Sequence, residues 1–216
     1  MGERNFGIRR YARQRTRNSS NCQHAVENTC ILATAIENLD RSEIQNMLQG
    51  RGPGGWHTVC LSYALQAASL EGSQDKADLL LAQGADINFV GGLFDTALVA
   101  TIIGGHSQMI AWLLQCGAAV DAETPLFCTP LQAATAFNQR RIVSILLEHG
   151  ADVNQVAGPH HTALQVAAIE GRTDILKILL ERGADARIQG GIYGTALRAA
   201  ALAGGISLPL VSDRIE

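Results

Sequence analysis

The chain has 216 residues, of which 47% are hydrophobic and 17% charged, enough apolar material for a substantial folded core. Residues 1–20 carry a net charge of +5 and the remainder −8, and such an acidic body disfavours general binding to phosphate backbones. There is no apolar run of membrane-spanning length, about 20 residues, and no secretory signal, while five cysteines without framework spacing indicate reduced thiols and an intracellular location, cytoplasmic or nuclear.

Residues 1–23 form a basic tail with six arginines against one glutamate. Its low apolar content predicts a disordered, solvated segment. Two other interpretations stay open. The dispersed arginines suit a nuclear or nucleic-acid-contacting arm, and their alternation with Phe6, Ile8 and Tyr11 suits an organelle presequence. Nucleic acid is expected as a partner only through this tail.

Residues 24–62 are expected to form a degenerate helical unit that caps the array following it. Ile31–Glu37 and Ser42–Gln49 each have the composition of a short helix. In the second helix, apolar side chains are expected to face inward: Ile44, Met47 and Leu48. The glycine-rich stretch at 50–55 then marks a loop. An unrelated helical extension is the alternative.

From residue 63 the sequence repeats with a period of 33, and several columns share this register. The threonine column is Thr96, Thr129, Thr162 and Thr195, and the glycine column is Gly84, Gly117, Gly150 and Gly183. A leucine column and a small-residue column accompany them: Leu65, Leu98, Leu131, Leu164 and Leu197; Ala68, Thr101, Ala134, Ala167 and Ala200. Coincidence does not produce four such columns.

Each unit is predicted to contain two short helices. Thr162 is expected to cap a first helix that stops at Gly171, and Asn138 holds the place of Gly171 one unit earlier. A second helix is predicted from Asp174 to Arg182, with a broad apolar stripe. Because helices this short are marginal alone, neighbouring pairs must cover one another's apolar faces in a stacked solenoid.

The segments Thr129–Leu131, Gly150–Asn154 and Gly183–Asp185 resemble the ankyrin repeat. The resemblance covers about 63–216 and implies an all-α ankyrin-repeat solenoid of helix-turn-helix units with short hairpin loops. Full units are expected at 63–95, 96–128, 129–161 and 162–194, with a partial, uncapped fifth at 195–216. The turn at 190–197 is similar to repeats common in fungal ankyrin proteins.

The sequence departs from the family pattern in several places. Tyr63 replaces the capping threonine of the first unit. Pro125 stands where the other units have glycine, so the hairpin of unit 96–128 is expected to be the least regular. Pro209 opposes a second helix in the last unit, because proline inside a helix costs about 3 kcal/mol. That unit frays, is covered by a partner, or belongs to a shortened version of a longer protein.

The resemblance implies partner binding through the hairpin tips and the inner helices, which together form a concave face. By matching position, the tip residues are Leu93, Asp95, Leu126, Cys128, Pro159, His161 and Ile192. The inner-helix residues are Leu70, Glu71, Ile103, Phe137, Ile169, Glu170 and Leu202. A further column, Phe94, Phe127, His160 and Tyr193, is interpreted as packing between hairpins, with partner contact as the alternative. For Phe137 packing and partner contact are weighed equally.

No catalytic constellation is found, and no cofactor is expected. His160-His161 and Cys22-Gln23-His24 with Cys30 lack the ligand spacing of a zinc site, and His106 is interpreted as structural. The sequence therefore predicts a non-catalytic adaptor or scaffold that binds another protein, with no membrane partner. A fragment of a larger ankyrin-containing signalling protein is the alternative, and an enzyme with an unrecognised site is the third class.

Overall fold

The computed structural model describes residues 40–49 and 58–204. These ranges contain a succession of short helices joined by turns and hairpins. In chain order the helices are α3 (Arg41–Gln49), α4 (Thr58–Glu71), α5 (Gln74–Ala82), α6 (Ala97–Gly104), α7 (Ser107–Gln115), α8 (Pro130–Ala136), α9 (Arg140–Glu148), α10 (Ala163–Ile169), α11 (Thr173–Glu181) and α12 (Ala196–Leu202).

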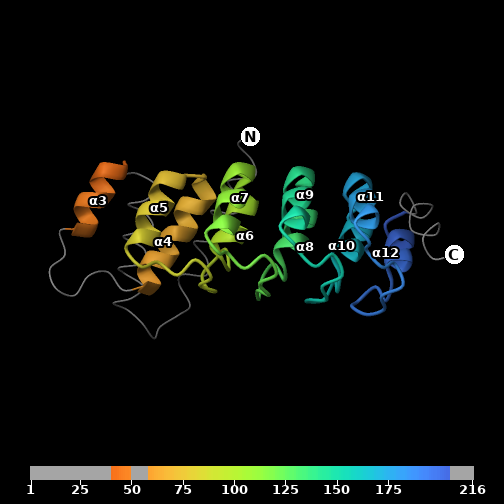
Figure 1. The fold of residues 1–216 in the computed structure, drawn as a ribbon. Coiled ribbons are helices and arrows are strands. Elements are labelled where there is room, and N and C mark those ends of the chain that lie inside the picture. Colours follow the sequence, from red (N-terminus) through yellow and green to blue (C-terminus); the bar gives the residue numbers. More distant parts are fainter. Residues whose placement is uncertain (1–39, 50–57, 205–216) are drawn as a thin grey trace, which may run out of the picture.

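The helices form antiparallel pairs that stand side by side in chain order, with the hairpin loops extending to one side (Figure 1). The inner helices α4, α6, α8, α10 and α12 contact one another in succession, and so do the outer helices α7, α9 and α11. Three hairpins close with a single bridge each: Thr124–Cys128, Ala157–His161 and Gly190–Gly194. The expected all-α solenoid is confirmed.

The threonine column begins the inner helices. Thr96, Thr129, Thr162 and Thr195 have extended backbone, and each side chain accepts a hydrogen bond from the backbone N–H three residues later. In α8 and α10 the residue at that third position is a glutamine, whose Oε1 accepts a hydrogen bond from the threonine N–H and completes a capping box. Asn138, at the end of the α8 segment, takes the left-handed conformation with φ 56° that was predicted from its alignment with Gly171.

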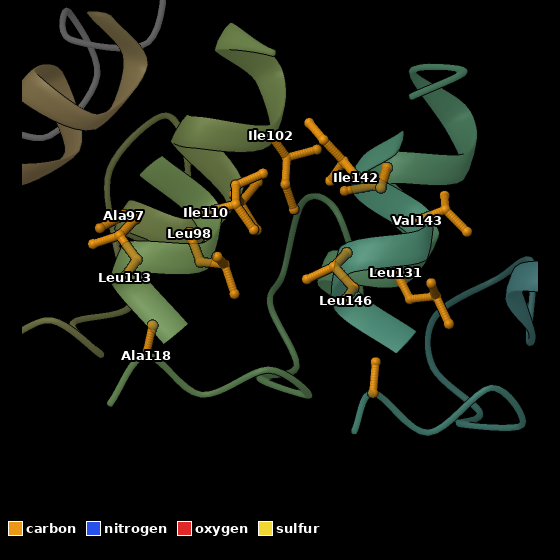
Figure 2. Close-up of a cluster of buried hydrophobic side chains, with 14 of the residues drawn as sticks. Ala97, Leu98, Ile102, Ile110, Leu113, Ala118, Leu131, Ile142, Val143 and Leu146 are labelled. Atoms are coloured by element: carbon orange, nitrogen blue, oxygen red, sulfur yellow. The ribbon is translucent and has the colours of Figure 1, made fainter. Parts of the chain in front are cut away.

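The core runs between the pairs as one continuous row. Leu65, Leu98, Leu131 and Leu164 are each at most 2% exposed, and alanine or Thr101 lies beside them with no exposure. Figure 2 shows Ile102 of α6 lying between its own pair and Ile142 of the next. Because a single pair leaves these side chains open on both faces, each repeat is stabilised mainly by its neighbours.

The first described pair differs from the prediction. Helix α4 begins at Thr58 and has 14 residues, so Tyr63 lies inside the helix and is not at its start. A tyrosine has no short side-chain acceptor to cap a helix, and residues 58–62 continue it toward the N-terminus. Tyr63 instead packs edge-on against Phe89, with ring centroids 5.1 Å apart.

Two smaller expectations also change. Helix α11 spans Thr173–Glu181, one residue earlier than predicted, with Arg182 at its cap. The hairpin of unit 96–128 is regular despite Pro125, since Thr124 and Cys128 pair as their equivalents do in the next two units. Pro125 therefore does not prevent the hairpin pairing, because the groups described below hold this hairpin in place.

Some predictions fall on residues outside the described ranges: the basic tail at 1–23, the helix Ile31–Glu37, the loop at 50–55 and the segment containing Pro209. The predicted Ser42–Gln49 helix appears as α3, which contacts α5. Ile44 and Leu48 of α3 are buried as expected, and the Met47 side chain is not among those described. None of the helices described is long and apolar enough to cross a membrane.

Candidate functional site

One column of apolar side chains recurs near the ends of the inner helices. Leu70, Ile103 and Ile169 come from α4, α6 and α10 and are partly buried, and Ile103 and Ile169 pack against the core. Leu202, at the end of α12, is 69% exposed. Since these positions are 33 or 66 residues apart, consecutive inner helices place them along one surface.

The next column is polar at its ends and aromatic in its middle. Glu71 pairs with Lys76 at 3.1 Å and Glu170 with Arg172 at 3.5 Å, so both carboxylates have a nearby cation. Phe137, which ends α8, remains 37% exposed. Its ring also lies against Phe127 of the preceding hairpin, with centroids 5.9 Å apart and planes tilted by 44°.

The hairpin tips continue this surface. Leu93 and Leu126 are partly buried, Pro159 is exposed and Ile192 is 65% exposed. The tips are also linked to one another, because Ile192 N–H donates to the Pro159 carbonyl at 3.0 Å. These tip residues form an apolar edge along neighbouring hairpins.

Asp95 does not belong to that exposed edge. It is only 2% exposed, and its Oδ2 accepts hydrogen bonds from Leu126 N–H at 2.9 Å and Phe127 N–H at 3.1 Å. Its backbone φ of 59° turns the side chain beneath the following hairpin. The expectation that Asp95 is exposed to a partner was therefore wrong, and its carboxylate fixes the tip of the next repeat.

His161 holds the equivalent position two units later and has the same left-handed backbone, with φ 72°. Its imidazole is partly buried and lies directly over Gly190 of the next hairpin. A Cβ at Gly190 would overlap this ring, so glycine is required there for the two hairpins to approach. Cys128 lies over Gly158 in the same manner. His161 and Cys128 thus contact the following repeat and are only partly accessible.

The aromatic column packs within the array. The rings of His160 and Tyr193 are stacked, with centroids 5.8 Å apart and planes at 20°, which links the last two hairpins described. Phe127 packs on Phe137 of the next inner helix. The contact of His160 with Tyr193 agrees with the interpretation of the column as packing between hairpins, whereas Phe127 packs on the end of a helix.

A glutamine column that the sequence analysis overlooked positions the hairpins. Gln66, Gln132 and Gln165 are each at most 4% exposed, and each Nε2 donates to two carbonyls of the adjoining hairpin at 3.0–3.4 Å. Their 33- and 66-residue spacing was the available signal. Val99 interrupts this column.

The hairpin of unit 96–128, where Val99 replaces the glutamine, is held by other groups. The Thr124 hydroxyl donates to Cys128 O at 3.2 Å, where a glutamine amide serves the other units, and Asp95 binds the tip. The equivalents of Thr124 are Gly91, Ala157 and Gly190, which have no hydroxyl. The departures in this unit therefore compensate one another.

Two expectations about histidine and metal-ligating residues can be compared with the structure. His106 Nε2 lies 3.0 Å from Leu70 O, in agreement with a structural role. In the described segments no group of three or more His, Cys, Asp or Glu is arranged to hold a metal ion. The set Cys22, His24 and Cys30 lies outside those segments.

The family model described as ankyrin repeats (3 copies) matches residues 65–157 and 99–190. Together the two matches cover residues 65–190, which is more than half of the 216-residue chain. A comparison with curated proteins gives no match.

Proposed function

Because this chain belongs to the ankyrin-repeat family, whose repeats are in general modules of protein–protein interaction, we propose that it is a non-catalytic adaptor or scaffold for a partner protein. The partner binds the recognition face, which we define as the accessible side chains of the inner-helix ends and hairpin tips. These residues are Leu70, Glu71, Leu93, Ile103, Leu126, Phe137, Pro159, Ile169, Glu170, Ile192 and Leu202.

The observation that carries this proposal is the exposure of apolar side chains at recurring positions. Leu202 and Ile192 are 69% and 65% exposed, and apolar residues at matching positions of earlier repeats are partly accessible: Leu70, Ile103, Ile169, Leu93 and Leu126. Phe137, in the neighbouring column, is 37% exposed. A single exposed leucine is ordinary, but apolar residues at matching positions of consecutive repeats form an extended row. Water is displaced from such a row when a partner covers it.

Phe137 is the best anchor on the recognition face. Its ring is supported on one side by Phe127, so its orientation is restricted before binding, and the other side is open. A partner therefore gains an aromatic contact with little loss of side-chain entropy. Truncation of such an anchor costs at least about 1–2 kcal/mol of binding free energy, roughly a tenfold loss of affinity.

The charges beside the row support a polar rim. Glu71 and Glu170 are exposed and each already has an intramolecular cation, Lys76 or Arg172. The Glu170–Arg172 pair is solvent-accessible and contributes little energy, and Glu71 is already bound to Lys76, whose side chain is only 16% exposed. We therefore assign the affinity for the partner to the apolar row. The two glutamates are assigned the alignment of the partner.

The test uses the full chain as bait in its native host, with captured proteins identified by mass spectrometry. Affinity for each captured protein is then measured with purified components for wild type, Phe137→Ala and Leu202→Asp. We expect about a tenfold or greater weakening for each variant. Unchanged circular dichroism and unfolding midpoints show that the variants remain folded.

The matched control is Gln108→Asp, which adds the same charge at an exposed position of outer helix α7. It should leave affinity unchanged. Equal affinities for wild type, Phe137→Ala and Leu202→Asp would show that the recognition face is not the binding surface. Equal weakening by Gln108→Asp would point to the outer helices or to a general charge effect.

A further inference from the structure

Asparagine side chains tie the loops that follow successive outer helices. Asn88 Nδ2 donates to Gly117 O at 3.1 Å, and its Oδ1 accepts from Ala119 N–H at 2.8 Å. Asn154 makes the same two bonds two repeat boundaries further along the chain. Its Nδ2 donates to Gly183 O at 3.2 Å, and its Oδ1 accepts from Asp185 N–H at 2.8 Å. Each amide thus acts as donor and acceptor at once across a repeat boundary.

Between these two asparagines, the same position is occupied by Asp121. Its two carboxylate oxygens lie 3.1 and 3.2 Å from Asp152 N, which donates to them. An ionised carboxylate has no hydrogen to donate, so the bond to the equivalent carbonyl, that of Gly150, cannot form. Only half of the asparagine link is present between repeats 96–128 and 129–161.

We propose that Asp121 is a proton-operated link, which completes the missing half of the bond when its carboxyl group is protonated and loosens the boundary between repeats 96–128 and 129–161 when it ionises. A protonated carboxyl group has one donor and one acceptor, as an amide does. The two repeats are then coupled more tightly in mildly acidic than in neutral surroundings.

The surroundings of Asp121 favour the protonated form. Burial raises the pKa of its carboxyl group, the charge of Asp152 raises it further, and the hydrogen bond from Asp152 N–H opposes both. Asp152, from the loop after α9, is the charged group that acts on it across the boundary. Glu123 on the same hairpin acts instead on Cys128.

A neighbouring acceptor also lacks a donor. Gln155 Nε2 donates to Asp121 O at 3.0 Å, while Gln155 Oε1 is buried with no hydrogen-bond partner. A buried unpaired acceptor is costly, so an added hydrogen-bond donor at this boundary would be stabilising. The single proton of a protonated Asp121 would be donated to Gly150 O, the carbonyl equivalent to those that the asparagine amides bind at the other two boundaries.

The sign of the effect follows from the raised pKa. An acid with a higher pKa in the folded than in the unfolded state binds more protons when folded, so the link strengthens as pH falls through the folded value. At pH values well above this raised pKa, Asp121 is ionised and the boundary is at its weakest. Replacing Asp121 with asparagine should remove this dependence.

The experiment measures the unfolding equilibrium constant in urea for full-length wild type and Asp121→Asn at about pH 7 and about pH 4. The readout is the difference between the two proteins, because every other titratable group is common to both. At pH 7 the variant should unfold with an equilibrium constant about threefold to tenfold smaller, from one additional hydrogen bond. At pH 4, closer to the raised pKa of Asp121, the difference between the two proteins should be smaller.

Two variants complete the test. Asn88→Asp, where the facing residue is uncharged Ala119, should lower stability at pH 7 and recover part of it at pH 4. Asp78→Asn, an exposed carboxylate on α5, should leave the pH dependence unchanged. A wild-type to Asp121→Asn difference that is equal at both pH values, or an Asp121→Asn protein less stable at pH 7, overturns the proposal.

Discussion

Replacing Asp95 with alanine should destabilise the hairpin of the following repeat. The carboxylate accepts from two backbone N–H groups, of Leu126 and Phe127, and it is almost fully buried. Each hydrogen bond to a charged group contributes about 1.5–3 kcal/mol, and the two N–H groups would be left without this acceptor. Alanine also tolerates the left-handed backbone less well than aspartate, by about 1 kcal/mol.

We therefore expect Asp95→Ala to lower the free energy of unfolding by about 3–5 kcal/mol, a large share of the 5–15 kcal/mol typical of a domain. Asp95→Asn keeps an acceptor and tolerates the backbone, so it should cost only about 1–2 kcal/mol. Urea unfolding followed by circular dichroism gives both values. Hydrogen exchange at the Leu126 and Phe127 amides shows whether the loss is local, which repeat arrays allow.

The matched control is Glu123→Ala, which removes an exposed carboxylate from the same hairpin and should change stability by no more than about 0.5 kcal/mol. A free energy of unfolding for Asp95→Ala within about 1 kcal/mol of wild type would refute the role of this carboxylate. An equal loss for Asp95→Asn and Asp95→Ala would refute it as well, because the side-chain acceptor would then be irrelevant.

Three further predictions concern neighbouring repeats. Gln132→Ala removes two 3.0 Å bonds to Ala157 O and His161 O, so urea unfolding should show a loss of about 2–3 kcal/mol; a loss below about 0.5 kcal/mol contradicts the hairpin role. Gly190→Ala forces a Cβ into the His161 ring at φ 149° and should lower the unfolding midpoint, an effect that His161→Ala relieves only in part because the backbone strain remains. Burial, with smaller effects of Asp95 and Glu123, raises the pKa of the Cys128 thiol, so at pH 8 iodoacetamide should label Cys128 more slowly than a cysteine in a short peptide. Equal labelling rates would contradict this.

The helical part of the fold could be predicted because its signals are local. Thr162 caps the helix that it precedes, and Asn138 adopts the left-handed conformation assigned from its position in the repeat. Leu164 is buried as its column requires. These properties depend on residues within one turn of the helix or on the 33-residue register, and both can be read along the chain.

The start of α4 could not be predicted in this way, because the register places a boundary at Tyr63 where the chain has no cap. The candidate site was predicted only in part for a different reason. Asp95 and His161 occupy matching tip positions, but their left-handed backbone turns both side chains toward the next repeat. Which way a tip residue faces is set by the neighbouring hairpin, and a column of Asp, Cys, His and Gly gives no pattern from which to infer it.

The buried glutamine amides have a consequence for how this surface can change. Gln132 and Gln165 hold their hairpins through main-chain carbonyls, and those carbonyls are present whatever side chain a tip carries. Exposed positions such as Pro159 and Ile192 can accept new side chains while the loop beneath them keeps its shape. On the proposed recognition face, the side chains of such tip residues can therefore vary without loss of the hairpin that carries them.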